Sequence, residues 1–173
     1  CLYGLLAHLV PMLVDRGIAP TDAAWAAALL GITILMSRAG VGYLIDQWFA
    51  PRVAAVCFAL PAAGLAWFAA GAADKISVGI ATCLVGLSIG AEFDLLAFLT
   101  SRYFGLQRFG TFYGVMFSGF LLGAAPGPVA YGAIFDNYGS YDPALAGAAC
   151  LLVVAALVML ILPEYRSDQL ARR

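Results

Sequence analysis

Residues 76–100 read ISVGIATCLVGLSIGAEFDLLAFLT, and this segment decides the fold class. Its only charged residues are Glu92 and Asp94. It is longer than the roughly 20 helical residues that cross a hydrocarbon core about 30 Å thick. Gly86 and Gly90 are four positions apart, which is the small-residue spacing that lets membrane helices approach closely. The segment therefore predicts a membrane-spanning helix that packs against a neighbouring helix.

Further apolar segments on both sides predict an all-α polytopic membrane protein. The chain is 64% hydrophobic and 11% charged, with a mean hydropathy of +0.94. Soluble domains average about 45–50% apolar and about 25% charged residues. The predicted helices cover residues 1–14, 23–41, 53–73, 76–100, 110–134 and 145–162. The first is too short to span, so we expect residues 1–173 to be a six-helix bundle whose first span is truncated.

Positive residues collect at one end of these spans. One side is predicted to hold Arg38, Arg52, Arg102, Arg108, Arg166, Arg172 and Arg173, whereas the other holds Arg16 and Lys75. Because cytoplasmic loops are enriched in Lys and Arg, the pattern predicts a plasma (inner) membrane protein with a cytoplasmic C-terminus. The net charge of −1 and the lack of a basic patch argue against a nucleic-acid partner.

The histidine and the cysteines favour neither an enzyme nor a metal site. An enzyme would place a cluster of His, Asp or Ser near one interface, but His8 is the single histidine. The cysteines at positions 1, 57, 83 and 150 do not have metal-ligand spacing. We therefore expect no catalytic activity, no metal and no cofactor.

Ionisable residues inside the predicted spans are the first candidates for function, because a charge at membrane depth needs a partner, water or a role. Arg38 lies about one turn from the end of its predicted helix, and an ion pair with Glu92 is feasible. Glu92 has either a proton- or substrate-coupling role or a structural one. Asp94 points about 200° away from Glu92, and a structural packing role is favoured for it. Arg38 either binds an anionic substrate or extends towards lipid headgroups.

His8 and two aromatic residues are further candidates. His8 either relays protons or packs as a neutral, hydrogen-bonded side chain, and packing is favoured. Tyr113 and Phe117 are one turn apart and line a cavity or contact lipid. In the same helix, Pro126 and Pro128 predict a bend. The glycines there, at positions 110, 114, 119, 123 and 127, predict a protein-facing surface.

Residues 37–52, SRAGVGYLIDQWFAPR, carry a recognisable motif. Gly42 and Asp46 have the spacing G-x-x-x-D, and Arg52 ends the segment. This resembles the cytoplasmic loop signature of the major facilitator superfamily as it recurs in the second half of those transporters, although Gln47 stands where a basic residue is usual. The resemblance implies that Asp46 stabilises one conformation against the positive end of a helix dipole.

A second resemblance covers residues 90–114, GAEFDLLAFLTSRYFGLQRFGTFYG, and 127–141, GPVAYGAIFDNYGSY. These segments are similar to the tenth to twelfth spans of monocarboxylate porters and oxalate/formate antiporter-like proteins. The resemblance implies that the chain is spans seven to twelve of a twelve-span transporter. It also implies that Arg38 contacts a substrate carboxylate. Ile34 stands where those porters have a partner Asp, so Glu92 is the candidate for coupling.

Together these patterns predict the C-terminal half of a secondary carrier. It would move a small organic anion such as a monocarboxylate by alternating access, either proton-coupled or as an antiporter. The predicted partners are that anion, membrane lipid and an N-terminal six-helix half. The alternatives are a non-transporting fragment, a six-span membrane scaffold and a homodimeric channel.

Overall fold

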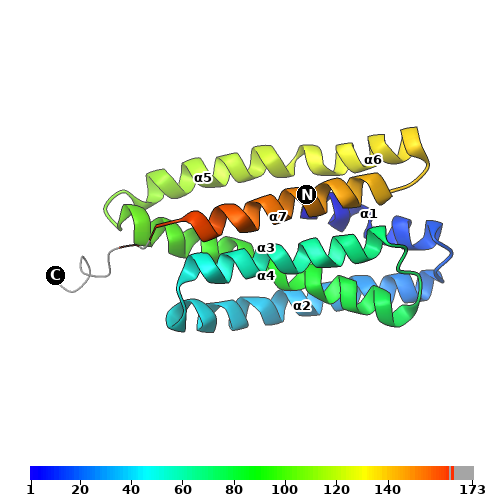
Figure 1. The fold of residues 1–173 in the computed structure, drawn as a ribbon, viewed down its shortest axis with the longest axis horizontal. Helices are drawn as coiled ribbons and strands as arrows, with labels where there is room; N and C mark the ends of the chain where they lie inside the picture. Colours follow the sequence, from blue (N-terminus) through cyan, green and yellow to red (C-terminus); the bar gives the residue numbers. More distant parts are fainter. Residues whose placement is uncertain (164, 166–173) are drawn as a thin grey trace.

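The computed structural model describes residues 1–163 and 165, which form helices and no strand (Figure 1). The helices are α1 (Leu2–Asp15), α2 (Pro20–Gln47), α3 (Ala50–Ala69), α4 (Lys75–Phe104), α5 (Phe109–Ala124), α6 (Pro126–Tyr138) and α7 (Asp142–Ile161). The all-α prediction is confirmed. Of the predicted tail cations, Arg166, Arg172 and Arg173 lie outside the described residues.

Five of the six predicted spans are long and apolar enough to cross a membrane. They are α2, α3, α4, α7 and the combined segment Phe109–Tyr138, which contains α5 and α6. The remaining helix, α1, has 14 residues, and a rise of about 1.5 Å per residue makes it about 21 Å long. The chain is therefore a helical membrane protein with several spans.

The helix ends follow local sequence signals. Pro20 occupies the first turn of α2, where the missing N–H costs nothing. Asp74 caps α4 by accepting a hydrogen bond from the Ser77 N–H at 3.0 Å, and the hydrogen bonds from Ser77 lower the pKa of the Asp74 carboxyl. Gly105 and Gly139 end α4 and α6 with positive φ angles of 75° and 66°.

α2 is longer than predicted, and the fifth span is broken where a bend was predicted. α2 continues to Gln47, whereas the prediction ended that helix at Val41. Nothing breaks the helix between these residues, because the next Pro is Pro51. In the fifth span, α5 ends at Ala124 and α6 begins at Pro126, where we predicted the bend. Pro126 cannot donate a backbone hydrogen bond, so the helical ladder is interrupted there.

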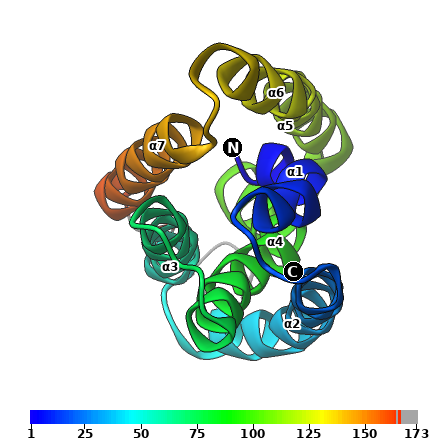
Figure 2. The same ribbon diagram turned by 90° about the vertical axis from the view of Figure 1, so that its right-hand side faces the viewer.

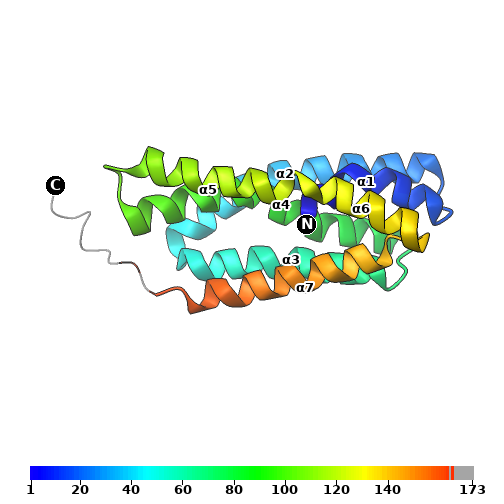
Figure 3. The ribbon, with the colours of Figure 1, turned by 90° about the horizontal axis from the view of Figure 1, so that it is seen from above.

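The helices run lengthwise through the bundle, and the end-on view shows α4 beside α2 and α3 (Figure 2). α4 packs along both α2 and α3, and α3 packs along α7. α1 packs on α6 and α2. The combined α5–α6 rod lies along the side of the bundle (Figure 3) and is attached sparsely, since no residue of α5 is buried.

The packing pattern repeats between the helices α1 to α3 and the helices α4 to α7. The first unit is α1, α2 and α3, and the second is α4, the α5–α6 segment and α7. Within the first unit α1 packs on α2 and α2 packs on α3. Within the second, α4 packs on α5 and α6 packs on α7. Between the units α2 packs on α4 and, reciprocally, α6 packs on α1, while the third spans α3 and α7 pack on each other. The pattern is incomplete at α1, because the extensive α3–α4 contact has no equally extensive counterpart between α7 and this short helix.

Glycines set the closest contact in the bundle. A Cβ at Gly86 would overlap Thr33 Oγ1, and a Cβ at Gly90 would lie 2.8 Å from the Ser37 Cβ, so both glycines are needed where α4 meets α2. This confirms the protein-facing prediction for the α4 glycines. Gly110, Gly114, Gly119 and Gly123 of α5 meet no neighbouring helix within this chain, so the protein-facing prediction stays a prediction for them.

Candidate functional site

Arg38 and Glu92 lie at nearly the same depth in the bundle. α2 and α4 run in the same direction, and Gly86 and Gly90 contact Thr33 and Ser37, a constant offset along the two helices. Extending this register places Glu92 level with the residue after Arg38, a depth difference of roughly 1.5 Å. This common depth agrees with the prediction that the two side chains lie close enough along the helices for an ion pair to be feasible.

Arg38 lies deeper than predicted. Because α2 runs on to Gln47, Arg38 is nine positions, or about 14 Å, from the helix end instead of one turn. Its side chain is exposed on the surface of the bundle. An arginine this far from the helix end is costly in hydrocarbon, so a lipid-facing position is disfavoured.

The predicted ion pair between Arg38 and Glu92 is not formed. Within residues 1–163 and 165 the structure contains the ion pairs Arg16–Asp142 and Lys75–Asp22, both at the opposite end of the bundle. Matching depth is not enough for a pair, because the two side chains must also point towards each other around their helices.

Glu92 borders two cavities. One, of about 180 Å³, lies between α3, α4, α5 and α7, and Ser88, Cys57 and Phe120 also line it. The other, of about 320 Å³, lies beside the start of α1, and Tyr3 and Phe120 share it with Glu92. Glu92 Oε2 is buried without a hydrogen-bond partner among the described residues. A carboxylate oxygen in this position is available to a proton or a ligand.

Aromatic side chains form one wall beside Glu92. Tyr113 and Phe117 stack with ring centroids 5.9 Å apart, and Phe117 stacks on Phe120 at 5.8 Å. Phe93, the neighbour of Glu92, contacts both phenylalanines, and Tyr3 meets Phe120 edge-on at 5.5 Å. Phe117 therefore contacts Phe93 and Phe120, which line a cavity with Glu92, and Tyr113 joins this wall through Phe117.

Tyr3, Phe93 and Phe120 were not predicted as site residues. Phe120 follows Phe117 at a spacing of three, so it lies on the same helix face. This spacing is the sequence signal that marks Phe120. Phe93 was noticeable only as the neighbour of Glu92. No local signal marks Tyr3, because its place beside α5 depends on how α1 packs.

His8 is held between α6 and the start of α7. Its Nε2 lies 3.0 Å from the Pro128 carbonyl oxygen, and its Nδ1 lies 3.2 Å from the Tyr141 hydroxyl. The carbonyl can only accept, so Nε2 carries the proton and Nδ1 accepts from Tyr141 when the ring is neutral. The imidazole also lies parallel to the Tyr131 ring, with centroids 6.3 Å apart. Both ring nitrogens therefore have partners in the bundle.

The remaining predicted residues lie apart from this wall. Gly42 and Asp46 are in the last turns of α2 and Arg52 is in the first turn of α3, so the predicted cytoplasmic loop is only Trp48 and Phe49. The loop assignment is wrong because the helix does not stop at residue 41. Asp94 is half-buried, one turn beyond Gly90 on α4.

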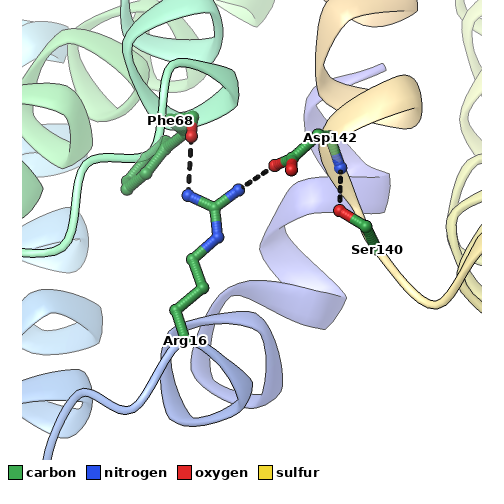
Figure 4. A network of polar contacts seen from close by, with 4 residues as sticks. All are labelled: Arg16, Phe68, Ser140 and Asp142. Carbon is green, nitrogen blue, oxygen red and sulfur yellow. Dashed lines mark hydrogen bonds and ion pairs between the residues drawn. The ribbon is translucent and has the colours of Figure 1, made fainter.

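The opposite end of the bundle is joined by a charged network (Figure 4). Arg16, after the end of α1, donates to the Phe68 carbonyl of α3 at 2.6 Å and pairs with Asp142 at the start of α7. The Ser140 hydroxyl accepts from the Asp142 N–H at 3.1 Å. This arrangement ties three helices together with one side chain.

In the described part of the chain, no group of three or more His, Cys, Asp or Glu side chains is placed to hold a metal ion. Comparison with models of known protein families finds no match, and comparison with curated proteins also finds none. The fold and composition establish a multi-span helical membrane protein. In it Glu92 Oε2, which has no hydrogen-bond partner among residues 1–163 and 165, and the exposed Arg38 lie at nearly the same depth.

Proposed function

We propose that this chain is the C-terminal half of a secondary carrier that moves a small organic anion, such as a monocarboxylate, by alternating access. The observation that carries the proposal is the repeated packing of two three-span units. Three is an odd number of spans, so consecutive units enter the membrane from opposite sides. Inverted repeats of this kind are typical of secondary transporters. The major facilitator resemblance of residues 37–52, 90–114 and 127–141 supports the same architecture.

In this proposal Arg38 binds the carboxylate of the substrate. Its guanidinium presents a planar fork that suits a carboxylate in two parallel hydrogen bonds. It is exposed and far from the helix end, which is tolerable for an arginine that faces an aqueous path between two halves. The half-buried aromatic rings beside Glu92 give the apolar part of a small organic acid a surface to contact.

Glu92 is the proposed coupling residue. Its Oε2 has no hydrogen-bond partner among the described residues, and Glu92 borders a cavity on each of two sides. A proton can therefore reach the carboxylate without breaking an ion pair. Protonation would remove a negative charge at the depth where the anion binds, which favours anion entry. This links anion and proton movement in the same direction. An antiporter would use the Arg38 site alternately for two anions instead.

The proposed partner is an N-terminal six-helix half that covers α5 and α2. α5 has no buried residue, and its glycines have open space in front of them. Close helix contact through glycine is how membrane helices associate without a hydrophobic driving force. The substrate would then lie between the halves, near the midplane.

Uptake of labelled lactate into proteoliposomes, made with the full product of the gene, tests this function. We expect uptake that rises with an inward proton gradient. Arg38→Gln should abolish uptake, whereas Glu92→Gln should keep lactate exchange and lose the response to the gradient. Uptake by the Arg38→Gln variant equal to wild type would refute the assignment of Arg38. Strong lactate flux through residues 1–173 alone would refute the half-carrier.

A homodimeric channel is the second candidate, favoured by the same exposed face of α5. Two copies of the chain would then meet along this helix. Cysteine crosslinking at Val115, whose side chain is 68% exposed, separates the two. A channel requires efficient crosslinking between copies in membranes, but a half-carrier that docks a different half does not.

A further inference from the structure

We infer that a groove between α2 and α3 binds one anionic phospholipid, with an acyl chain in the groove and the headgroup at Arg52. The groove has a volume of about 440 Å³. Ligand pockets usually measure about 300–1,000 Å³. Met36, Leu44 and Trp48 of the α2 side line it, with Val56 and Leu60 from α3 and Leu87 from α4.

The length of the groove matches one leaflet of a bilayer. Met36 and Trp48 are twelve positions apart, which corresponds to about 18 Å along the axis of α2. Half of a hydrocarbon core about 30 Å thick is about 15 Å. The groove therefore runs from the membrane interface to near the midplane, which is the path of an acyl chain.

The interface end of the groove is marked by an exposed tryptophan and an arginine. Trp48 is 65% exposed, and tryptophan prefers the headgroup level. Arg52 lines the same end and is exposed, with its guanidinium 5.8 Å from the Phe49 ring. Arg52 also lies in the first turn of α3, where the helix dipole adds positive potential. The Ala50 N–H at this end donates to the Tyr165 hydroxyl at 3.5 Å, and no acidic residue lies in the first turn.

The charge at this end selects an anionic headgroup. A basic residue next to an apolar groove between membrane helices is the arrangement that binds phosphate headgroups of acidic lipids. Asp46 is two positions from both Leu44 and Trp48, about 200° around the helix, so it points away from the groove. The headgroup phosphate thus meets Arg52 without the carboxylate.

Quenching of Trp48 by brominated lipid tests the inference. The chain is reconstituted in phosphatidylcholine vesicles that contain increasing fractions of brominated phosphatidylglycerol or, separately, brominated phosphatidylcholine. The difference between wild type and Trp48→Phe isolates the Trp48 signal. We expect half-maximal quenching at a several-fold lower fraction of the anionic lipid. Arg52→Gln should raise that fraction about fivefold and leave quenching by brominated phosphatidylcholine unchanged.

Two further variants make the test specific. Arg108→Gln removes another exposed arginine near the same end, outside the groove, and should not change the quenching. Gly40→Leu fills the groove and should reduce quenching by both lipids, whereas Gly31→Leu on the same helix should not. Equal quenching by the two lipids in wild type, or no effect of Arg52→Gln, would overturn the inference. So would a crosslink between copies through a cysteine at Val56, because a second chain would then occupy the groove.

Discussion

Thr33 Oγ1 occupies the space that a side chain at Gly86 would need. A Cβ added there would also lie 2.9 Å from the Thr33 Cβ and 3.1 Å from the Leu30 carbonyl oxygen. This contact fixes the register of α2 against α4, and with it the common depth of Arg38 and Glu92. One glycine therefore connects helix packing to the proposed transport site.

Gly86→Ala should destabilise the bundle by about 1–3 kcal/mol, because overpacking forces the two helices apart. Unfolding by SDS in mild detergent measures the change. The matched control is Gly31→Ala on α2, where a Cβ meets open space and the better helix propensity of alanine should stabilise slightly. Thr33→Ala should partly rescue Gly86→Ala. Equal effects at Gly31 and Gly86 would show that close packing is not the cause.

Arg16→Gln should destabilise by roughly 1 kcal/mol, since it removes the ion pair with Asp142 and weakens the bond to the Phe68 carbonyl. The Arg16 side chain is only 18% exposed, whereas that of Lys75 in the other ion pair is 58% exposed. Lys75→Gln should therefore cost less, and thermal melting in detergent compares the two. A larger loss for Lys75→Gln would contradict this ranking.

Glu92→Leu should stabilise the isolated chain by about 1–3 kcal/mol, because it removes a buried carboxylate oxygen that has no hydrogen-bond partner. The comparison is made at pH 8, where an ordinary carboxyl is ionised. A gain in stability at a site proposed for coupling would be the usual trade between stability and activity. If Glu92→Leu lowers the melting temperature instead, the carboxylate has a structural partner and the coupling role fails.

Gly114→Leu should change the stability of the isolated chain by no more than about 1 kcal/mol, since a side chain at Gly114 meets open space. Gly90→Leu on α4 should be far more damaging, because a Cβ there meets Ser37 at 2.8 Å. Under the proposed function, Gly114→Leu should block assembly of the chain with the proposed N-terminal half. Blue native electrophoresis reads out assembly, and full assembly of the variant would remove α5 from the proposed interface.

A pair of cysteine variants tests the predicted orientation. Leu106 lies at the arginine-rich end and Tyr138 at the other, and both are highly exposed, at 71% and 72%. With the native cysteines replaced by serine, an impermeant maleimide added to intact cells should label Tyr138→Cys and not Leu106→Cys. Reversed labelling would place the arginine-rich end outside. Breaking the cells should expose both sites and serves as the control.

Much of the site was visible in the sequence, but its arrangement was not. Glu92, Tyr113 and Phe117 were recognisable because a charge or a run of aromatic residues within an apolar segment is a local feature. The relation of Arg38 to Glu92 was not, since it depends on where α2 ends and how α2 and α4 rotate against each other. The glycines of α4 and α5 look alike in the sequence, yet only those of α4 meet a neighbouring helix.

By itself the sequence determined the helical membrane-spanning character, the capacity of Gly86 and Gly90 for close contact and the break before Pro126. Hydrophobic length, the absence of a Cβ and the missing proline N–H act within one helix, so they can be read locally. Only the tertiary structure decided which helices pair, how deep Arg38 lies and that Tyr3 joins the aromatic wall. The reason is that lipid solvates every apolar helix face about equally well. Which helices pack together therefore depends on the steric fit between residues far apart in the chain.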